Sequence, residues 1–484
     1  MKNNLNIARE LRCTILICFL GLMCSCKKFI EVKAPVTNIN AGNVYEDDTN
    51  AAAVLTGLYA NMVANEFSFN LSVYPELSAD NVILFDQNDN TAKAFYQNAL
   101  NSEFSGGGLW NNIYTNIYVV NAAIEGLNSS THLTPAIKSR LLGESYFMRG
   151  FYYFYLVNLY GELPLVLSTD YKVNSLLARS SINAIYGQII NDLKTSQGLL
   201  DNRYMNGAVT GATNDRVRPN RAAATALLAR IYLYSKNYAE AQIQSSEVIQ
   251  QSAMYAMASD LDAVFLKGST ETIWALQPVN AGYTIPEGFH YIIIGNGNGE
   301  SGMVYFNNDF LNSFDNGDQR RVKWVGNQVI NLKLYTYPFK YKVKTNSQTR
   351  AEYITVLRLA EQYLIRAEAK IQNDDIAGGV ADLNVLRARA TDQNAVPADR
   401  LKQLSITLSK QEALNAVERE RRSELFTEWG NRWFDLKRTN RVNEVMQVAT
   451  PPKGGVWTPF RSLYPIPIGD IRSCPNLVQN PGYK

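Results

Sequence analysis

The chain is 484 residues long and nearly balanced in charge, with 47 lysine and arginine residues against 44 aspartate and glutamate residues. Because no block of basic residues occurs, the sequence lacks the electrostatic footprint of nucleic-acid binding, and we expect no nucleic-acid partner. It has two histidines, His132 and His290, so acid–base catalysis or metal binding would have to depend almost entirely on carboxylates.

The N-terminus has the features of an export signal. After a basic start, residues 13–25 carry no charge, a length typical of a signal peptide and short of the roughly 20 apolar residues in a membrane-spanning helix. Cys26 then follows a small residue, which resembles a bacterial lipoprotein signal in which the new N-terminal cysteine is acylated. The alternatives are a cut before Cys24 and an ordinary secretory peptide. We predict a signal peptide at 1–25, lipidation of Cys26 and a tether at 26–45.

Beyond the tether, apolar residues recur every three or four positions, which predicts amphipathic helices. The first four are expected at 51–63, 109–127, 137–160 and 181–200. The third has aromatic residues on so wide a face that we expect it to be buried on most sides.

Two later segments, 220–251 and 357–390, each predict a pair of helices joined by a short polar turn. Both have small residues where the two helices would cross closely, as a helical repeat requires. No strict 34-residue period is present, so the pairs predict a scaffold related to tetratricopeptide repeats.

The segment from 256 to 353 has a different character, rich in glycine, asparagine and aromatic residues with short apolar runs. Long insertions of this kind are usually functional, so we expect an irregular, partly β segment that faces a ligand. Residues 441–484 are proline-rich and are expected to be extended. The fold class is therefore mostly α, with residues 46–484 as one domain whose helical scaffold covers about 46–255 and 354–440.

Five motifs occur in order along the chain and resemble those of one family. They are residues 144–164 with their aromatic cluster, the repeat-like 229–234 and 363–369, the charged run 418–438, and the C-terminal stretch formed by 463–467 and 475–483. With these motifs, residues 26–484 resemble the SusD/RagB family.

The resemblance implies a surface-exposed lipoprotein of the outer membrane, anchored in membrane lipid through Cys26. Such proteins cap a SusC-like TonB-dependent transporter and bind a glycan, or in some members a peptide, for import. They are not enzymes, so the resemblance implies no catalytic residues, no metal and no cofactor. A lipid-anchored glycoside hydrolase that uses two carboxylates is the rival function.

Sugar recognition stacks aromatic rings on pyranose faces and fixes hydroxyl groups with amides and carboxylates. We expect such rings where helical periodicity does not account for them, in a first loop region at 67–85 and in the 256–353 insertion. The candidate ligand-binding residues are Asp80, Asn81, Phe85, Tyr283, Phe289, His290, Tyr291 and Trp324.

Three further patterns favour structural interpretations. In the run 418–438, carboxylates and arginines fall one helical turn apart, which indicates ion pairing more than an acid–base pair. Residues 86–97 begin like a calcium loop but lack its sixth-position glycine and twelfth-position glutamate, which favours a polar loop. Residues 297–302 fit a dinucleotide fingerprint without the strand–helix units around it, which favours a loop there too.

Overall fold

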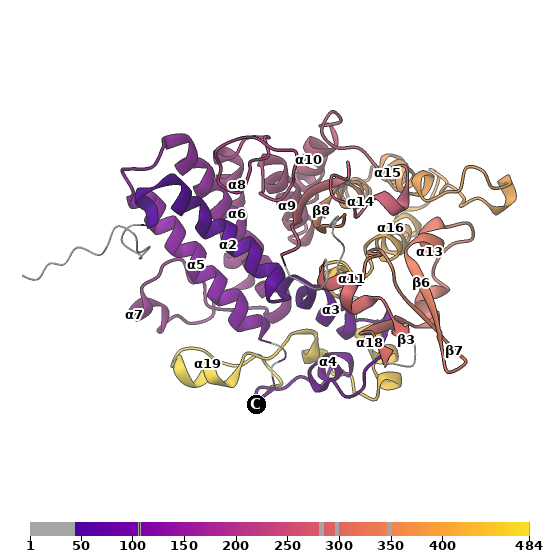
Figure 1. Cartoon of the computed structure of the whole chain (residues 1–484). Helices are drawn as coiled ribbons and strands as arrows, with labels where there is room; N and C mark the ends of the chain where they lie inside the picture. The colour runs from indigo at the N-terminus through magenta and orange to yellow at the C-terminus, as the bar shows by residue number, and fades with distance from the viewer. Residues whose placement is uncertain are drawn as a thin grey trace, which may run out of the picture. The chain divides into compact units, whose positions relative to one another are not determined.

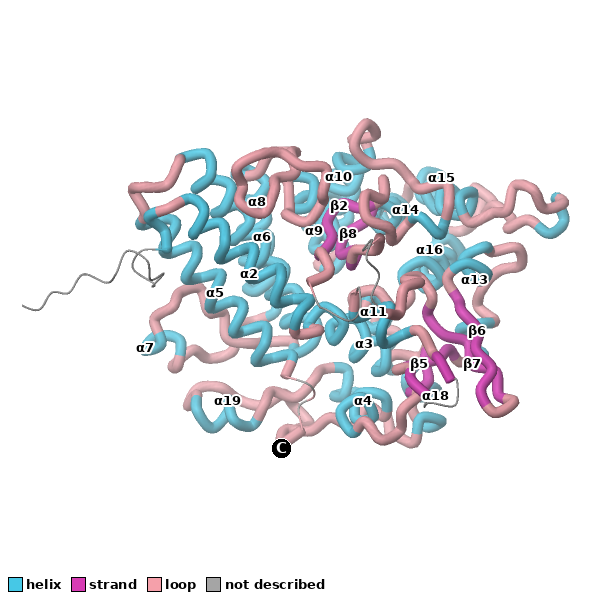
Figure 2. Tube along the Cα trace, in the orientation of Figure 1, coloured by secondary structure: helices cyan, strands magenta, loops and turns pink. Residues whose placement is uncertain are grey.

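The computed structural model describes residues 44–104, 106, 108–279, 285–295, 300–345 and 351–483. Contacts within the chain separate Met1–Val44 from Tyr45–Lys484, and every described α-helix and β-strand belongs to the second unit. Helices account for most of its secondary structure, as predicted (Figure 2). In the described part of the chain, none of the helices has the run of apolar residues that crossing a bilayer requires.

The N-terminal half is built from helices, most of them long, and some begin at a capping residue that the sequence shows. Their bounds are α2 (Asp48–Ala64), α3 (Phe67–Ser78), α4 (Asn90–Tyr96), α5 (Leu109–Ser129), α6 (Pro135–Tyr160), α7 (Tyr171–Asn174), α8 (Ile182–Leu199), α9 (Arg221–Tyr234) and α10 (Tyr238–Ile249). The side chain of Ser181 caps α8 by accepting a hydrogen bond from the Ala184 N–H, and Asn220 caps α9 in the same way. The helices predicted from periodicity are therefore present.

Neighbouring helices along this half pack against one another in a continuous series (Figure 1). From α5 the contacts run through α6, α8, α9 and α10 to α14 (Leu359–Gln372), which packs on α15 (Ile376–Arg389) and α16 (Lys410–Leu425). The predicted pairs at 220–251 and 357–390 are thus α9–α10 and α14–α15. Because α10 packs against α14, the two pairs are joined although about a hundred residues separate them.

The strands of the described residues form four two-stranded antiparallel sheets, mostly within the predicted insertion. The pairs are β1 (Val82–Leu84) with β5 (Val304–Phe306), β2 (Thr272–Leu276) with β8 (Ile354–Arg358), β3 (Ile294–Gly295) with β4 (Glu300–Ser301), and β6 (Val325–Ile330) with β7 (Lys333–Pro338). In the described part of the insertion, three short helices lie between the strands, α11 (Pro286–Tyr291), α12 (Asn308–Leu311) and α13 (Gln319–Lys323). The insertion is partly β, as predicted, with more helix than its irregular composition indicated.

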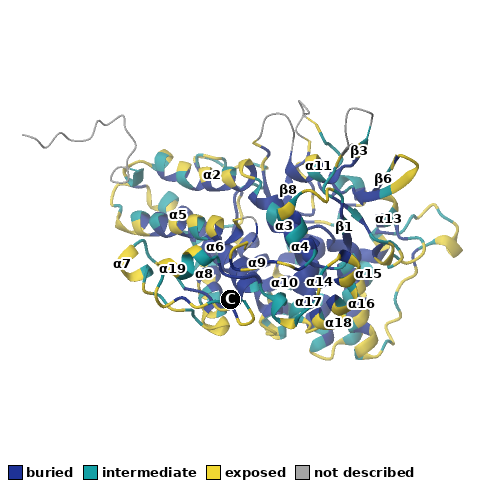
Figure 3. Cartoon of the chain, turned by 90° about the horizontal axis from the view of Figure 1, so that it is seen from below, coloured by how far each residue is buried: buried dark blue, intermediate teal, exposed yellow. Residues whose placement is uncertain are grey.

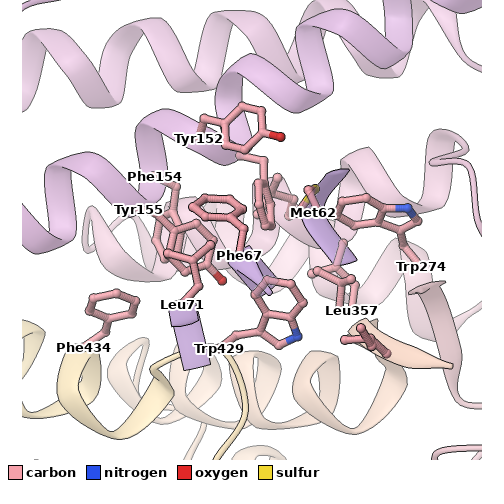
Figure 4. Close-up of a cluster of buried hydrophobic side chains, with 14 of the residues drawn as sticks. Met62, Phe67, Leu71, Tyr152, Phe154, Tyr155, Trp274, Leu357, Trp429 and Phe434 are labelled. Carbon is pink, nitrogen blue, oxygen red and sulfur yellow. The ribbon is translucent and has the colours of Figure 1, made fainter. Parts of the chain in front are cut away.

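The main hydrophobic core surrounds α6, whose C-terminal half is buried on nearly every side (Figures 3 and 4). The ring of Phe151 lies edge-on to Trp274 of β2 at 5.5 Å and to Trp429 at 5.9 Å, measured between ring centroids. Phe154 meets Phe434 at 6.0 Å. The aromatic residues of the third predicted helix are therefore core, as their spacing indicated.

Two segments differ from their predictions. The expected first loop region contains α3, in which Phe67, Phe69 and Tyr74 are all buried. Its sequence has no clear helical period and contains Pro75, so the helix depends on tertiary packing in the core rather than on local propensity. The expected extended C-terminal segment contains α18 (Val442–Ala449) and α19 (Ile468–Ser473).

The charged run 418–438 is also divided. Its residues belong to α16 and α17 (Asn431–Arg438), separated by a turn in which Thr427, Trp429 and Gly430 all have positive φ angles. The turn redirects the chain so that Trp433, on α17, is fully buried.

Candidate functional site

Two segments that the sequence singled out are hydrogen-bonded to the same residue, Met303. The Phe85 N–H donates a hydrogen bond to the Met303 carbonyl oxygen at 2.9 Å, and the Met303 N–H donates to the His290 carbonyl oxygen at 2.9 Å. Met303 comes directly before β5, which pairs with β1. The pairing therefore brings Phe85, at the end of β1, and His290, on α11, beside the same backbone.

Three partly exposed rings gather where β5 packs beside β7, and we call Phe85, Tyr305 and Tyr335 the aromatic surface. The centroid of Tyr335 lies 5.1 Å from that of Phe85 and 5.1 Å from that of Tyr305, with near-perpendicular planes. Phe85 and Tyr305 lie 6.5 Å apart, again edge to face. These contacts hold the rings in fixed orientations while part of each ring stays in solvent, which suits contact with a ligand.

A cation and a polar loop border the aromatic surface. The Lys333 ammonium is exposed and lies 5.2 Å from the Tyr305 ring centroid and 4.6 Å from that of Tyr335. The loop directly after Phe85 exposes Asp86, Gln87 and Asn88. Donors and acceptors of hydrogen bonds therefore adjoin the rings.

Phe289 and His290 form a second exposed patch on α11. The Phe289 side chain is 37% exposed, and the Lys344 ammonium lies 5.3 Å from its ring centroid. The His290 ring stacks on Phe69 at 4.6 Å, and its Nε2 lies 3.1 Å from Glu66 Oε1. The imidazole is thus held by Phe69 of α3 and by Glu66, directly before α3, and His290 remains partly exposed.

Comparison with known proteins agrees with the five motifs. Residues 28–233 match a SusD-like family described as starch-binding and associating with the outer membrane, and residues 298–483 match the SusD family. The chain belongs to the SusD/RagB family.

Relatives of this family match the chain over nearly all its length. SusD-like protein P25 of Formosa agariphila is 23% identical, over 97% of this chain and 99% of the relative. Among solved structures, surface glycan-binding protein A from Bacteroides fluxus is 20% identical with a TM-score of 0.73, covering 90% of this chain and 99% of its own. A laminarin-binding SusD-like protein is 21% identical with the same TM-score, covering 91% and 100%. The structural likeness establishes the SusD fold.

Three predicted ligand residues of this SusD/RagB-family chain are instead buried. Trp324 is fully buried, and its Nε1 donates a hydrogen bond to the Leu261 carbonyl oxygen at 2.9 Å. Tyr291 is 3% exposed and Asn81 is fully buried, its amide donating to Glu76 Oε1 at 2.8 Å. Their prediction as surface contacts was wrong because irregular local sequence says nothing about burial by distant segments.

Asp80 lies in the wall of a surface cavity but its carboxylate already has partners. Arg432 donates to both oxygens at 2.7 Å, and Arg422 donates to one at 3.2 Å. Burial would raise the pKa of Asp80, but the two guanidinium groups outweigh it and hold the pKa well below its usual range. Asp80 therefore ties the end of α3 to α16 and α17. Its carboxylate thus has a structural role, and its assignment as a ligand contact stays a prediction.

Two other predicted residues, Cys26 and Tyr283, lie outside the described residues, as do residues 297–299 of the glycine-rich stretch at 297–302.

The carboxylates in the charged run form ion pairs, as predicted, although the partners of Glu424 lie outside the run and not one helical turn away. Glu424 is fully buried and accepts hydrogen bonds from Arg358 and Arg389 at 2.5 Å each and from Arg320 at 2.9 Å. Burial alone would raise the pKa of Glu424, but these arginines lower it well below the usual range. A carboxylate so strongly held as an anion is a poor proton donor or acceptor near neutral pH.

The acidic residues in the loop after Phe85 have structural roles. Asp86 accepts a hydrogen bond from the Asn88 N–H at 2.9 Å, and Asp89 caps α4 by accepting from the Ala92 N–H at 2.9 Å. Among the described residues, no group of three or more acidic, histidine or cysteine side chains is arranged to hold a metal ion. The polar-loop interpretation therefore accounts for this segment.

Tyr305, Tyr335 and Lys333 were missed by the sequence analysis. The signal available was the alternation from Lys333 to Pro338, which is typical of a strand and places Tyr335 and Tyr337 on one face. It could not indicate that Tyr335 would stay partly exposed, because that depends on where β5 and β7 pack.

Proposed function

We propose that this protein binds a glycan at the aromatic surface and delivers it to a SusC-like TonB-dependent transporter in the outer membrane. In this proposal, Cys26 carries the lipid anchor and the binding face looks outward from the cell. Support comes from the family, described as starch-binding and associating with the outer membrane, and from relatives named for binding laminarin or surface glycans.

The aromatic surface carries the proposal. Its three rings are oriented by contacts with one another, yet they remain partly exposed, whereas most other large rings of the described chain are buried. An aromatic face contacts the C–H groups of a sugar ring, while neighbouring side chains such as Gln87, Asn88 and Lys333 bind its hydroxyl groups. The surface is shallow, so we expect single-site affinities of roughly micromolar to millimolar. Docking beside a transporter compensates for this weak affinity, because it raises the effective concentration of the glycan at the transporter.

The test replaces Phe85, Tyr305 and Tyr335 together by alanine in the full-length chain, purified in detergent. Calorimetry and affinity electrophoresis with starch and laminarin measure binding. The unaltered protein should bind at least one of them, and the triple variant should bind it at least tenfold more weakly. Tyr171→Ala is the matched control, since this tyrosine is 73% exposed and lies on α7, away from the surface.

Several outcomes would contradict the proposal. Binding that survives the triple replacement would place the glycan elsewhere. Binding of a peptide mixture with no binding of polysaccharide would favour a peptide-binding protein of the same transporter type. Sustained release of reducing ends from a polysaccharide would favour a glycoside hydrolase.

A further inference from the structure

A groove of about 630 Å³ lies between β1, α4, the start of α12 and α18, and we call it the α18 groove. Its volume is typical of clefts that bind small ligands. The rings of Phe85, Tyr305 and Tyr335 do not line it. The groove is therefore a compartment separate from the aromatic surface. The lining residues that carry the argument are Ile83, Tyr96, Asn308, Asp309, Val448 and Pro452.

Two observations connect the α18 groove to the aromatic surface. Ile83 lies directly opposite Tyr305 in the β1–β5 pair, and the side chains of opposite residues lie on the same face of a sheet. Tyr96, which also lines the groove, interacts electrostatically with Tyr305. A ligand that contacts the Tyr305 ring can therefore continue past Ile83 and Tyr96 into the groove.

Part of the groove is apolar and open to solvent. Val448 of α18 is 75% exposed, Pro452 is exposed, and Ile83 is half-buried. Exposed apolar side chains gathered in a concave site are typical of a surface that a ligand covers. These side chains suit the C–H groups of a sugar ring.

Polar side chains with free hydrogen-bonding capacity lie in the same lining. Asn308 and Asp309 are exposed at the start of α12, and neither side chain makes a hydrogen bond or ion pair within the described part of the chain. The amide offers both donors and an acceptor, and the carboxylate offers two acceptor oxygens. Both groups are thus available to the hydroxyl groups of a ligand.

The charges of the groove favour a neutral ligand. Arg422 is paired with Asp80, and the Lys453 ammonium donates hydrogen bonds to backbone carbonyl oxygens at the end of α3. The carboxylates of Asp309 and Glu444 remain exposed. The cations of the lining are therefore bound to protein groups, whereas two carboxylates face solvent and would repel an anionic chain.

We propose that the α18 groove binds the second part of a neutral oligosaccharide whose first part lies on the aromatic surface. This inference rests on the proposed glycan-binding function and narrows its ligand to a chain of several uncharged sugars. A chain that occupies both places makes two sets of contacts for a single loss of translational freedom, so its affinity should rise with its length.

Calorimetry on the full-length chain in detergent tests this dependence on length and charge. The probes are malto- and laminari-oligosaccharides of two and six sugars, and hexagalacturonate as the anionic chain. In at least one neutral series, the hexasaccharide should bind at least tenfold more tightly than the disaccharide, and more tightly than hexagalacturonate.

The outcomes separate this inference from the function on which it rests. Equal affinities of the disaccharide and the hexasaccharide would overturn the second compartment and leave glycan binding in place. Tighter binding of hexagalacturonate would overturn the neutral chain. Failure of both neutral series to bind would overturn this inference, and failure of starch and laminarin as well would contradict the proposed function.

Variants assign the effect of length to the α18 groove. Asn308→Ala combined with Asp309→Ala should weaken hexasaccharide binding at least tenfold and leave disaccharide binding unchanged. Both side chains are exposed, and an unchanged melting temperature would show that the variant is folded. The matched control is Gln447→Ala, since Gln447 is exposed beside Val448 on α18 but does not line the groove. A folded double variant that binds the hexasaccharide like the unaltered protein would overturn the proposal.

Discussion

At the scale of single residues, Glu287 shows how burial changes a carboxyl group beneath an exposed patch. It lies on α11 two residues before Phe289, is 3% exposed, and its Oε2 has no hydrogen-bond partner among the described residues. Burial raises the pKa of Glu287 to about 8, and the nearby charge of Glu66 adds to the effect, against a smaller opposing hydrogen bond from its own backbone N–H. The folded protein therefore holds a proton there at neutral pH.

This predicts a pH dependence that Glu287→Gln should remove. Between the ordinary pKa of 4.5 and about 8, the folded state binds more protons at this site than the unfolded state. Its contribution to stability is therefore fully present below about 4.5 and is lost as the pH rises through about 8. Glutamine stays neutral, so the variant should gain stability relative to the unaltered protein as the pH rises.

Melting temperatures at pH 5, 6.5 and 8 in matched buffers would measure this difference. The comparison must be between the two proteins, because burial lowers the pKa of Lys437 and of Lys453 to about 7 and gives the opposite trend above that pH. Melting temperatures with the same pH dependence in both proteins would show that Glu287 is ionised in the folded state.

At the scale of elements, the turn between α16 and α17 decides where the most charged part of the chain goes. Lys340, two residues after β7, donates hydrogen bonds from its ammonium to the carbonyl oxygens of Glu424 at 2.8 Å and Phe426 at 2.9 Å. These bonds fix the end of α16. Gly430 then takes φ = +73°, a left-handed conformation that favours glycine. A Cβ there would lie 2.9 Å from Cβ of Pro75, which is part of buried α3.

Gly430→Ala should therefore destabilise the protein by about 1–3 kcal/mol, from the left-handed backbone and the close contact with Pro75. Gly57→Ala is the matched control. Gly57 is exposed within α2 and has no atom within 4 Å of an added Cβ, so alanine should stabilise the helix by about 0.5–1 kcal/mol. Chemical denaturation measures the free energy of unfolding of both variants. Equal effects of the two substitutions would be inconsistent with the tight turn.

At the scale of the whole unit, the C-terminal segment returns to the N-terminal helices, and Figure 1 shows α19 running near α5 and α7. The Tyr464 N–H donates to the Leu159 carbonyl oxygen at 2.8 Å, and the Asn480 amide donates to the Tyr160 carbonyl oxygen at 2.9 Å. Residues near the C-terminal end of the unit thus stabilise the end of α6.

The proposed anchor concerns the whole protein and its location. Cys26→Ser should move the protein from the membrane fraction to the soluble fraction, since acyl chains on that cysteine would supply the membrane affinity. Fractionation of cells followed by a carbonate wash measures the distribution. Serine-substituted protein that still pellets with membranes would contradict lipidation at Cys26. Ser25→Ala, which keeps a small residue before the cysteine, is the control and should remain in the membrane fraction.

The sequence by itself determined the helical scaffold and the family. The helices at 109–127, 137–160 and 181–200 and the pairs at 220–251 and 357–390 were predictable because their apolar spacing and capping residues are local properties of the chain. That the charges of 418–438 form ion pairs was also predicted, but the partners were not, because Glu424 pairs with Arg320, Arg358 and Arg389 of distant segments. Of the candidate ligand residues, Phe85, Phe289 and His290 do lie partly exposed.

Only the tertiary structure decided which rings face solvent. Trp324 and Tyr291 sit in irregular sequence like Phe289, yet segments far along the chain bury them, while the same packing leaves Tyr305 and Tyr335 partly open. The helix at Phe67–Ser78 likewise forms because the core surrounds it, in spite of Pro75. Whether a side chain is buried depends on contacts with residues far along the chain. Where the sequence has no helical period, its local pattern does not indicate those contacts.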